Sequence, residues 1–256
     1  MKQNVIINAD LCIGCGACEQ DCPQLEFRIV DGKATTVSER CIRCGHCLAI
    51  CPKGAISMCN AYEESVPIDL REQVDPSVLH NVLYQRRTIR QFRQQDISTD
   101  IIADILDAGR VTHTGKNRQG LTFYVLEDQK DAAEEIGVAW FRKIKTLCSP
   151  ISSYFRWKQI PDDFFFRGAP CAIVIVGEHE SDGVFAAANM EYMAEAHGLG
   201  VMVSGFFTTA VNRSGKLRKL LDIPKGSHAL ATLVLGYPKV RYFRTVPRDP
   251  LNARYL

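Results

Sequence analysis

Residues Cys12–Pro23 read CIGCGACEQDCP, and residues Cys41–Pro52 read CIRCGHCLAICP. Both stretches follow the spacing C-x₂-C-x₂-C-x₃-C-P, so the first 60 residues are internally duplicated with a repeat near 29 residues. Each half is expected to contain a short strand, a cysteine loop and a helical turn that ends at Cys-Pro. The strand pieces are expected at Val5–Ile7, Ala34–Val37 and Ala55–Ser57. The duplicated spacing is the strongest structural signal in the chain.

Bacterial ferredoxins use this spacing to hold a pair of [4Fe–4S] clusters. Three thiolates two residues apart converge on three corners of one cubane, whereas the fourth starts a helical turn and ligates the other cluster. The predicted ligands of one cluster are Cys12, Cys15, Cys18 and Cys51, and those of its partner are Cys41, Cys44, Cys47 and Cys22. Gly14, Gly16 and Gly45 let backbone N–H groups approach the cluster sulfides.

Two other uses of cysteine explain the pattern less well. Structural zinc uses paired C-x-x-C knuckles, which leaves the third and fourth cysteine of each run without a role. A secreted disulfide framework needs a signal peptide, and Met1–Asn4 leads into no apolar segment. The chain is therefore expected in the cytoplasm. Cys59, Cys148 and Cys171 lie outside both runs and are expected to be buried small hydrophobic residues.

The composition favours a folded protein with two unequal domains. The chain has 256 residues, of which 46% are hydrophobic and 23% charged, enough for a sizeable core. A formal net charge of +2 gives no reason to expect a nucleic-acid partner. No apolar run reaches the roughly 18 residues that a membrane span needs. A polar stretch suggests the boundary, so the predicted parts are residues 1–60, a linker at 61–76, and residues 77–256.

From Pro76 onwards the pattern alternates between helices and apolar strands. Helices are expected from Pro76 to the following arginines and at Ser98–Gly109, Asp131–Leu147, Asp182–His197 and Ser214–Leu221. Strands are expected at Leu121–Leu126, Cys171–Val176 and Ala229–Leu235. This mixture indicates a layered α+β or α/β domain. A Rossmann site is not expected, because Val203 stands where the third glycine after Gly198 and Gly200 would be.

The arginine segment Arg86–Arg90 reads RRTIR. If it is helical, Arg86 and Arg90 share a face at i,i+4, where like charges repel. An anion between the guanidinium groups would relieve this repulsion, and phosphate suits arginine because it is bound bidentately. The competing interpretation is a basic helix end that faces water.

Five segments, in order along the chain, resemble the nitroreductase family of FMN-binding oxidoreductases. They are RRTIRQF (86–92), HTGKNRQGLTFYVL (113–126), GAPCAIVIVG (168–177), NMEYMAEAHGLGVMVSGFF (189–207) and LGYPK (235–239). Gly120 and Leu121 replace the proline or tryptophan usual in the second segment. The resemblance implies an α+β fold: a ferredoxin-like two-cluster domain followed by an FMN domain with a central, mainly antiparallel sheet flanked by helices. The simplest family members lack the cysteine-rich addition.

The resemblance also implies a role for particular residues. Those implied to hold the FMN phosphate are Arg86, Arg87, Thr88, Arg90 and Arg248. Those implied at the pyrimidine edge of the flavin are Asn117 and Gln119. The backbone N–H groups of Ser204 and Gly205 would face flavin N5 and O4, where negative charge develops. No catalytic side chain is implied, and the family's intertwined homodimers place two FMN sites at the subunit interface.

Two features of the sequence each allow two interpretations. Residues 151–167 contain six aromatic side chains that would either stack on a planar acceptor or pack at the dimer interface: Tyr154, Phe155, Trp157, Phe164, Phe165 and Phe166. His113 is either a proton donor to the flavin chemistry or a polar loop histidine without a specific role.

The expected function is that of an FMN enzyme with its own electron carriers. Electrons from a ferredoxin or flavodoxin would pass through the clusters to FMN and then reduce a nitroaromatic compound, a quinone or an activated alkene. One alternative is an NAD(P)H-dependent nitroreductase whose clusters store or export electrons. The other is a non-catalytic relay or redox sensor.

Overall fold

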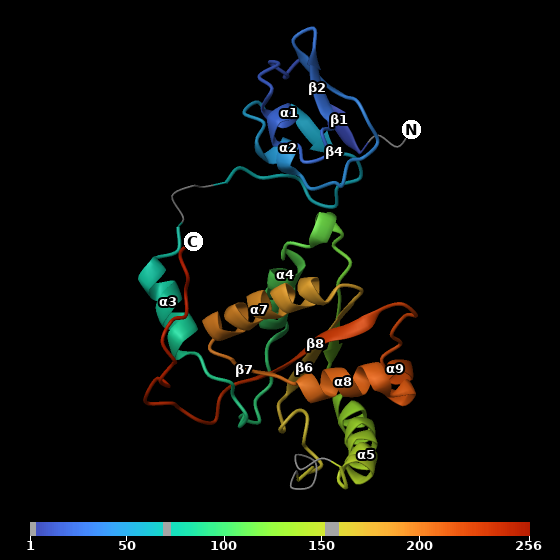
Figure 1. Ribbon diagram of the computed structural model, residues 1–256, viewed down its shortest axis with the longest axis vertical. Helices are drawn as coiled ribbons and strands as arrows, with labels where there is room; N and C mark the ends of the chain where they lie inside the picture. Colours follow the sequence, from blue (N-terminus) through green and yellow to red (C-terminus); the bar gives the residue numbers. More distant parts are fainter. Residues whose placement is uncertain (1–3, 69–72, 152–158) are drawn as a thin grey trace. The chain divides into compact units, whose positions relative to one another are not determined.

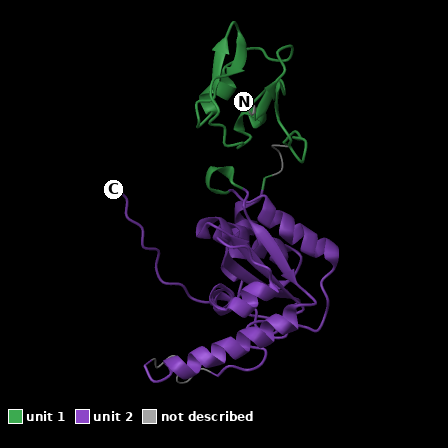
Figure 2. Cartoon of the chain, turned by 90° about the vertical axis from the view of Figure 1, so that its right-hand side faces the viewer, with its two compact units in different colours: residues 1–73, 114–118 green, residues 74–113, 119–256 purple. Residues whose placement is uncertain are grey.

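The computed structural model describes residues 4–68, 73–151 and 159–256. The chain divides into two compact units, which are coloured separately in Figure 2. Unit 1 consists of residues 1–73 together with residues 114–118. Unit 2 consists of residues 74–113 and 119–256. The short segment 114–118 therefore packs with the cysteine-rich unit although both of its sequence neighbours belong to the other.

Unit 1 is built from two small antiparallel sheets and two short helices. The strand pairs are β1 (Val5–Ile7) with β4 (Ile56–Met58), and β2 (Phe27–Val30) with β3 (Lys33–Thr36). The helices α1 (Ala17–Asp21) and α2 (His46–Ala49) follow Gly16 and Gly45, which both have φ of 79°. Glycine adopts this left-handed conformation at little cost, so each cysteine loop turns sharply into its helix. The three predicted strand pieces are present, and β2 is an additional strand.

A four-stranded antiparallel sheet forms the centre of unit 2 (Figure 1). Its strand order is β5 (Thr122–Leu126), β6 (Cys171–Gly177), β8 (His228–Gly236) and β7 (Gly200–Val203). The predicted strands correspond to β5, β6 and β8, whereas β7 is an additional short strand at one edge.

Helices cover both faces of this sheet. Ile173 and Ile175 of β6 belong to a core with α4 (Thr99–Arg110) and α7 (Glu180–Ala196). Val174 and Val176 belong to the opposite core, which is formed with the helices α5 (Lys130–Cys148), α8 (Gly205–Arg213) and α9 (Gly215–Leu220). Because β6 is covered on both sides, its apolar residues form a continuous run without polar alternation. Unit 2 is thus a three-layer α+β structure.

Helix α3 (Pro76–Gln85) differs from the other helices of unit 2. Asp75 caps it by accepting hydrogen bonds from the backbone of Ser77 at 2.7 Å and Val78 at 3.3 Å. No residue of α3 is buried, and its apolar side chains Val78, Leu79, Val82, Leu83 and Tyr84 are all exposed. The tail, residues 241–256, is exposed throughout. Among the described residues, no helix has the length and apolar character to cross a membrane.

Candidate functional site

The eight cysteines of the duplicated run gather in the two sets that the spacing assigned. One small cavity is lined by Cys12, Cys15, Cys18 and Cys51, and a second is lined by Cys22, Cys41, Cys44 and Cys47. Within the described ranges, no three His, Cys, Asp or Glu side chains are grouped tightly enough to hold one metal ion. Each set has four cysteines, which is the number of thiolate ligands that one [4Fe–4S] cluster takes.

Backbone donors already point at the cysteine sulfurs. The N–H groups of Ala34 and Ala55 donate to Cys12 Sγ at 3.3 Å and to Cys51 Sγ at 3.2 Å. The N–H of Arg43 donates to Cys41 Sγ at 3.4 Å. These bonds favour a charged sulfur, and the bond from Ala34 is the main reason why the pKa of Cys12 is lowered. Such N–H···S bonds also tune iron–sulfur clusters, so the residues present fit two of them.

Burial has the opposite effect on the cysteines that start the helices. It raises the pKa of Cys18 and raises that of Cys47 to about 11. Without a cluster these two thiols would stay protonated at neutral pH, so cluster binding must displace their protons. Of the remaining cysteines, Cys171 is buried as expected, whereas Cys59 and Cys148 are only half-buried.

The arginine segment is extended, not helical. Helix α3 ends at Gln85, and Arg86 has ψ of 137°. The predicted pairing of Arg86 and Arg90 on one helix face is therefore wrong. The N–H of Ile89 donates to the carbonyl of Val201 in β7 at 3.0 Å, and the buried Ile89 side chain packs on Gly200. This anchor leaves Arg86, Arg87 and Thr88 half-buried and Arg90 exposed.

Three of the family-like segments are joined by backbone hydrogen bonds. Besides the bond from Ile89 to β7, the N–H of Arg93 donates to the carbonyl of Tyr237 at 2.8 Å. The N–H of Lys239 donates to the carbonyl of Gln91 at 2.9 Å. The arginine segment thus runs between β7 and the residues that follow β8, and Ser204 and Gly205 follow the same strand β7. The structure therefore brings the implied phosphate and N5 segments to one edge of the sheet.

Arg86 has both a carboxylate partner and an unsatisfied nitrogen. Its guanidinium Nη1 donates to Glu191 Oε1 of α7. Burial raises the pKa of Glu191 and of the neighbouring Glu195, and Arg86 opposes both shifts. The Nε of Arg86 is buried and has no acceptor among the described residues. A cleft of about 550 Å³ lies beside it, lined among others by Arg86, Arg87 and Tyr242. The two guanidinium groups are of the kind that binds phosphate, although the carboxylate of Glu195 lines the same cleft.

The other implied flavin contacts are spread over the chain. Asn117 lies in unit 1, where its amide Nδ2 donates to the carbonyl of Arg43 at 2.6 Å. Gln119 is exposed, and Arg248 lies in the exposed tail. The N–H of Ser204 donates to the carbonyl of Thr232 at 2.8 Å, so this donor is used within the sheet and cannot face a flavin. Gly205 begins α8 and is exposed.

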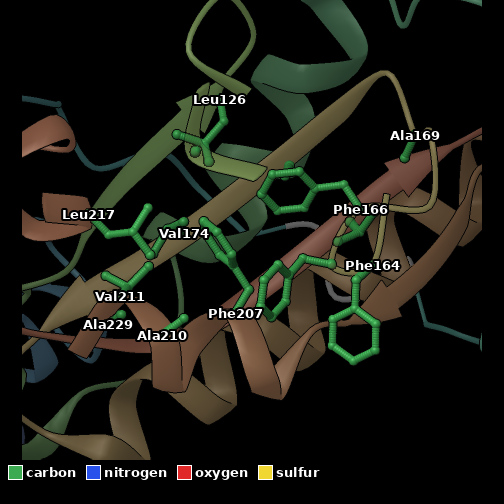
Figure 3. Packing of buried hydrophobic residues seen from close by; sticks show 14 of the residues in the cluster. Leu126, Phe164, Phe166, Ala169, Val174, Phe207, Ala210, Val211, Leu217 and Ala229 are labelled. Atoms are coloured by element: carbon green, nitrogen blue, oxygen red, sulfur yellow. The ribbon is translucent and has the colours of Figure 1, made fainter. Parts of the chain in front are cut away.

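The described part of the aromatic segment is core. Phe165 and Phe166 pack against Phe207 of α8, and Phe164 packs against Phe165. All three are buried, and Figure 3 shows Phe164 and Phe166 in this core. Both interpretations of these three residues, stacking on an acceptor and packing at a dimer interface, are therefore wrong. The other three members, Tyr154, Phe155 and Trp157, lie outside the described residues.

The carboxylate that holds these phenylalanines was not recognised in the sequence. Glu134 of α5 is 9% exposed and accepts hydrogen bonds from the N–H groups of Phe165 at 2.7 Å and Phe166 at 2.8 Å. Burial raises the pKa of Glu134 to about 7, although both hydrogen bonds act against this shift. His113 is exposed, and its ring lies 4.4 Å from that of Phe185.

Comparison with known proteins gives two family matches. Residues 83–237 match the model of the nitroreductase family, and residues 4–52 match that of the 4Fe–4S dicluster domain. A relative from Archaeoglobus fulgidus, named as a candidate NADH dehydrogenase/NAD(P)H nitroreductase, is 25% identical over 168 residues. That match covers 62% of this chain and 84% of the relative.

Solved structures with the same fold include enzymes crystallised with FMN. A nitroreductase with bound FMN from Bacteroides fragilis gives a TM-score of 0.57 at 18% identity, covering 71% of this chain and 100% of that chain. An FMN-dependent nitroreductase from Clostridium difficile gives 0.55 at 20% identity, covering 69% and 98%. An iodotyrosine deiodinase bound to FMN and 3-iodo-L-tyrosine also gives 0.55 at 20% identity, covering 69% and 98%.

Proposed function

Because this chain belongs to the nitroreductase family and carries a 4Fe–4S dicluster domain, we propose that it conducts electrons through two [4Fe–4S] clusters to FMN and reduces a small organic acceptor. The donor is a low-potential one-electron protein of the ferredoxin or flavodoxin type. The acceptor is a nitroaromatic compound, a quinone or an activated alkene. The observation that carries the proposal is the gathering of eight cysteines into two sets in a chain with the flavin-family fold.

The protein is a flavin-dependent oxidoreductase, and its own residues bind and orient the cofactor. Arg86 and Arg87, which line the cleft, would hold the FMN phosphate together with the neighbouring Thr88 and Arg90. Glu191 already pairs with the other side of Arg86, so this arginine binds less tightly than a free guanidinium. When bound, FMN converts one-electron transfer into two-electron reduction.

The start of α8 stabilises the charge that develops during reduction. The exposed Gly205 is the first residue of α8, whose N-terminal N–H groups carry partial positive charge. With the Ser204 N–H bonded inside the sheet, this helix start takes over the role of facing the flavin ring. Reduction of each acceptor molecule takes two electrons and two protons, and the protons come from solvent.

The functional assembly is a homodimer. The apolar side chains of α3 have no cover in the described part of this chain, and the tail beyond Val240 leaves the body of unit 2 (Figure 2). A second copy would bury both. Light scattering should give twice the chain mass of 28.6 kDa, and Leu79→Glu combined with Leu83→Glu should halve it. An unchanged mass for this variant would remove α3 from the interface.

Anaerobic stopped-flow absorbance of the protein loaded with FMN and clusters tests the electron source. Reduced ferredoxin should bleach the flavin band without any acceptor, whereas NADH and NADPH should bleach it much more slowly. Fast bleaching by a nicotinamide would overturn the proposed donor. It would favour the alternative in which the clusters store or export electrons. The name of the Archaeoglobus fulgidus relative, which includes NAD(P)H, is the reason for testing this alternative.

Measurement of steady-state turnover distinguishes an enzyme from a non-catalytic electron relay. Consumption of a nitroaromatic compound, a quinone or an activated alkene under steady-state conditions supports the enzyme. Reduction of both cofactor types without any consumption, together with tight binding to a partner protein, would identify a relay instead.

A further inference from the structure

The internal duplication of unit 1 allows equivalent positions of its two halves to be compared at an offset of 29 residues. At this offset Glu26 corresponds to Ala55, and the two backbones make the same contact. The N–H of Glu26 donates to Cys22 Sγ at 3.4 Å. In the same way, the N–H of Ala55 donates to Cys51 Sγ at 3.2 Å. Both residues are 3% exposed, so Glu26 buries a carboxylate where its counterpart has a methyl group.

The first cysteine loop is held by a neutral, exposed side chain. The Oδ1 atom of Asn8 accepts hydrogen bonds from the N–H groups of Asp10 at 2.9 Å and Leu11 at 3.3 Å. Leu11 directly precedes Cys12. The amide of Asn8 therefore fixes the backbone that enters the first loop.

The second cysteine loop lacks this amide, because Val37 stands at the position of Asn8. Glu26 supplies the acceptor instead. Its Oε2 atom accepts hydrogen bonds from the N–H of Arg40 at 3.2 Å and from the hydroxyl of Ser38 at 2.5 Å. The N–H of Arg40 is shared with the hydroxyl oxygen of Ser38 at 3.3 Å, and Arg40 directly precedes the first cysteine of the second loop. A buried carboxylate thus does for the second loop what a neutral amide does for the first.

Glu26 is the only buried charged side chain in the described part of unit 1, residues 4–68 and 114–118. Each cysteine loop also has a cation. Lys33 Nζ donates to the carbonyl of Cys12 at 2.7 Å in the first loop, and Arg43 lies within the second. Lys33 is exposed and Arg43 is half-buried, so water screens both more than it screens Glu26.

We propose that Glu26 positions the entry to the second cysteine loop and lowers the midpoint potential of the second cluster, so that the two clusters of unit 1 are not equivalent. The second cluster is the one assigned to Cys22, Cys41, Cys44 and Cys47. This inference rests on the proposed function, which places [4Fe–4S] clusters in unit 1. Reduction gives the cluster one electron that the external donor loses. A nearby negative charge opposes that gain, since the net charge around a cluster helps to set its potential.

Matched substitutions of glutamate by glutamine test the role of the charge. Glu26→Gln keeps an acceptor oxygen and removes the charge, and Glu39→Gln makes the same change at an exposed position that also precedes the second loop. The full-length protein and both variants are loaded with clusters and FMN and titrated potentiometrically, with detection by electron paramagnetic resonance. Cys15→Ser and Cys44→Ser, which each alter the spectrum of one cluster, assign the two signals.

Glu26→Gln should raise the midpoint potential of the second cluster. At a fixed ambient potential its ratio of reduced to oxidised form should rise about tenfold, which for one electron is a shift of about 59 mV. The first cluster should shift much less. Glu39→Gln should change the ratio of either cluster by less than about twofold, because water and salt screen an exposed charge.

A second pair of variants tests the positioning role. Glu26→Ala copies Ala55 and removes the acceptor, so the second cluster should be lost faster to a chelator. Glu26→Ala combined with Val37→Asn copies the first half into the second, and the Val37 side chain is 53% exposed, which leaves room for the amide. This double variant should retain both clusters and show the same raised potential as Glu26→Gln. Equal rates of cluster loss in the single and double variants would refute the positioning role.

Three results would overturn the effect on the potential. They are an unchanged second cluster in Glu26→Gln, an equal shift in Glu39→Gln, and a larger shift of the first cluster than of the second. Iron and sulfide analysis precedes the titration, and a natural protein that binds no clusters would overturn both this inference and the proposed function. The titration uses no organic acceptor. If the potentials shift as expected but no acceptor is consumed at steady state, the proposed function fails while the role of Glu26 stands.

Discussion

Unit 1 and unit 2 are stabilised by cores of different chemistry. The apolar core of unit 1 consists of a few small side chains and Phe27, packed together with buried cysteines. In unit 2, aliphatic and aromatic side chains fill both faces of a sheet. A domain of about 60 residues is only marginally stable, and much of this core consists of cysteines. Unit 1 should therefore need its clusters to fold, whereas unit 2 should not.

Removing the iron should give the largest effect. Chelation under oxidising conditions should unfold unit 1 and leave unit 2 folded, because metal-binding free energy is folding free energy in small metal-dependent modules. Limited proteolysis should then cut residues 4–68 rapidly and spare the sheet of unit 2. Protease resistance of residues 4–68 in iron-free protein would contradict the expectation that unit 1 needs its clusters to fold.

Phe165→Ala should give the next largest effect, confined to unit 2. Phe165 is 1% exposed and contacts Phe207, so its truncation should lower the free energy of unfolding by about 3–5 kcal/mol. Denaturant titration measures the loss. Phe243→Ala, at a side chain that is 83% exposed, is the control and should change little. The cluster spectra should stay the same in both variants.

The third prediction concerns pH. The pKa of Glu134 is raised to about 7 in the folded protein, so the folded state holds a proton that the unfolded state releases near pH 4.5. Its stabilising contribution is therefore complete below pH 4.5 and is lost as the pH rises to about 7. The loss is on the order of 3–4 kcal/mol, from about 1.4 kcal/mol per unit of pKa shift. Denaturant titrations of unit 2 at several pH values should show it.

Glu134→Gln is the matched variant for that measurement. It cannot titrate, so the difference in unfolding free energy between it and the natural protein should change between pH 4.5 and about 7 and stay flat above. A constant difference across this range would show that another group causes the pH dependence.

The smallest expected effect is the difference in stability between alanine substitutions at two glycines of unit 1. Gly14 and Gly54 both have positive φ, but a Cβ at Gly14 would meet the Gly32 carbonyl whereas one at Gly54 would meet nothing within 4 Å. Gly14→Ala should therefore destabilise unit 1 by about 1–3 kcal/mol more than Gly54→Ala. Thermal loss of the cluster absorbance measures the difference, and equal losses would show that the close approach is unimportant.

The features predicted correctly from sequence were those with local causes. The cysteine spacing predicts two groups of four because it depends on a tight loop, and the structure gathers the cysteines in the same two groups. Their role as cluster ligands stays a prediction. The continuous apolar run of β6 indicated a strand covered on both faces, which it is. A family resemblance added the flavin chemistry.

The features that were missed depend on distant partners. Phe164–Phe166 follow two aspartates and precede an arginine, and their burial depends on Glu134, about 30 residues earlier in the chain. Strand β7 has only four residues and begins shortly after α7 ends at Ala196, so it is too short to give a clear strand pattern. Arg86 and Arg90 separate because the backbone bond from Ile89 to Val201 draws the segment out of helical conformation. No local sequence pattern predicts contacts between residues that are so far apart in the chain.

The membership of residues 114–118 in unit 1 has a consequence for how the two modules were joined. A domain added at the end of a gene is usually connected by one linker and can be cut away intact. Here the backbone passes between the units three times, at residues 73–74, 113–114 and 118–119. A truncated protein ending at residue 73 would lack a piece of its own fold, and a flavin domain expressed alone would keep a turn that has lost its support. A cut after residue 73 therefore does not separate two complete domains.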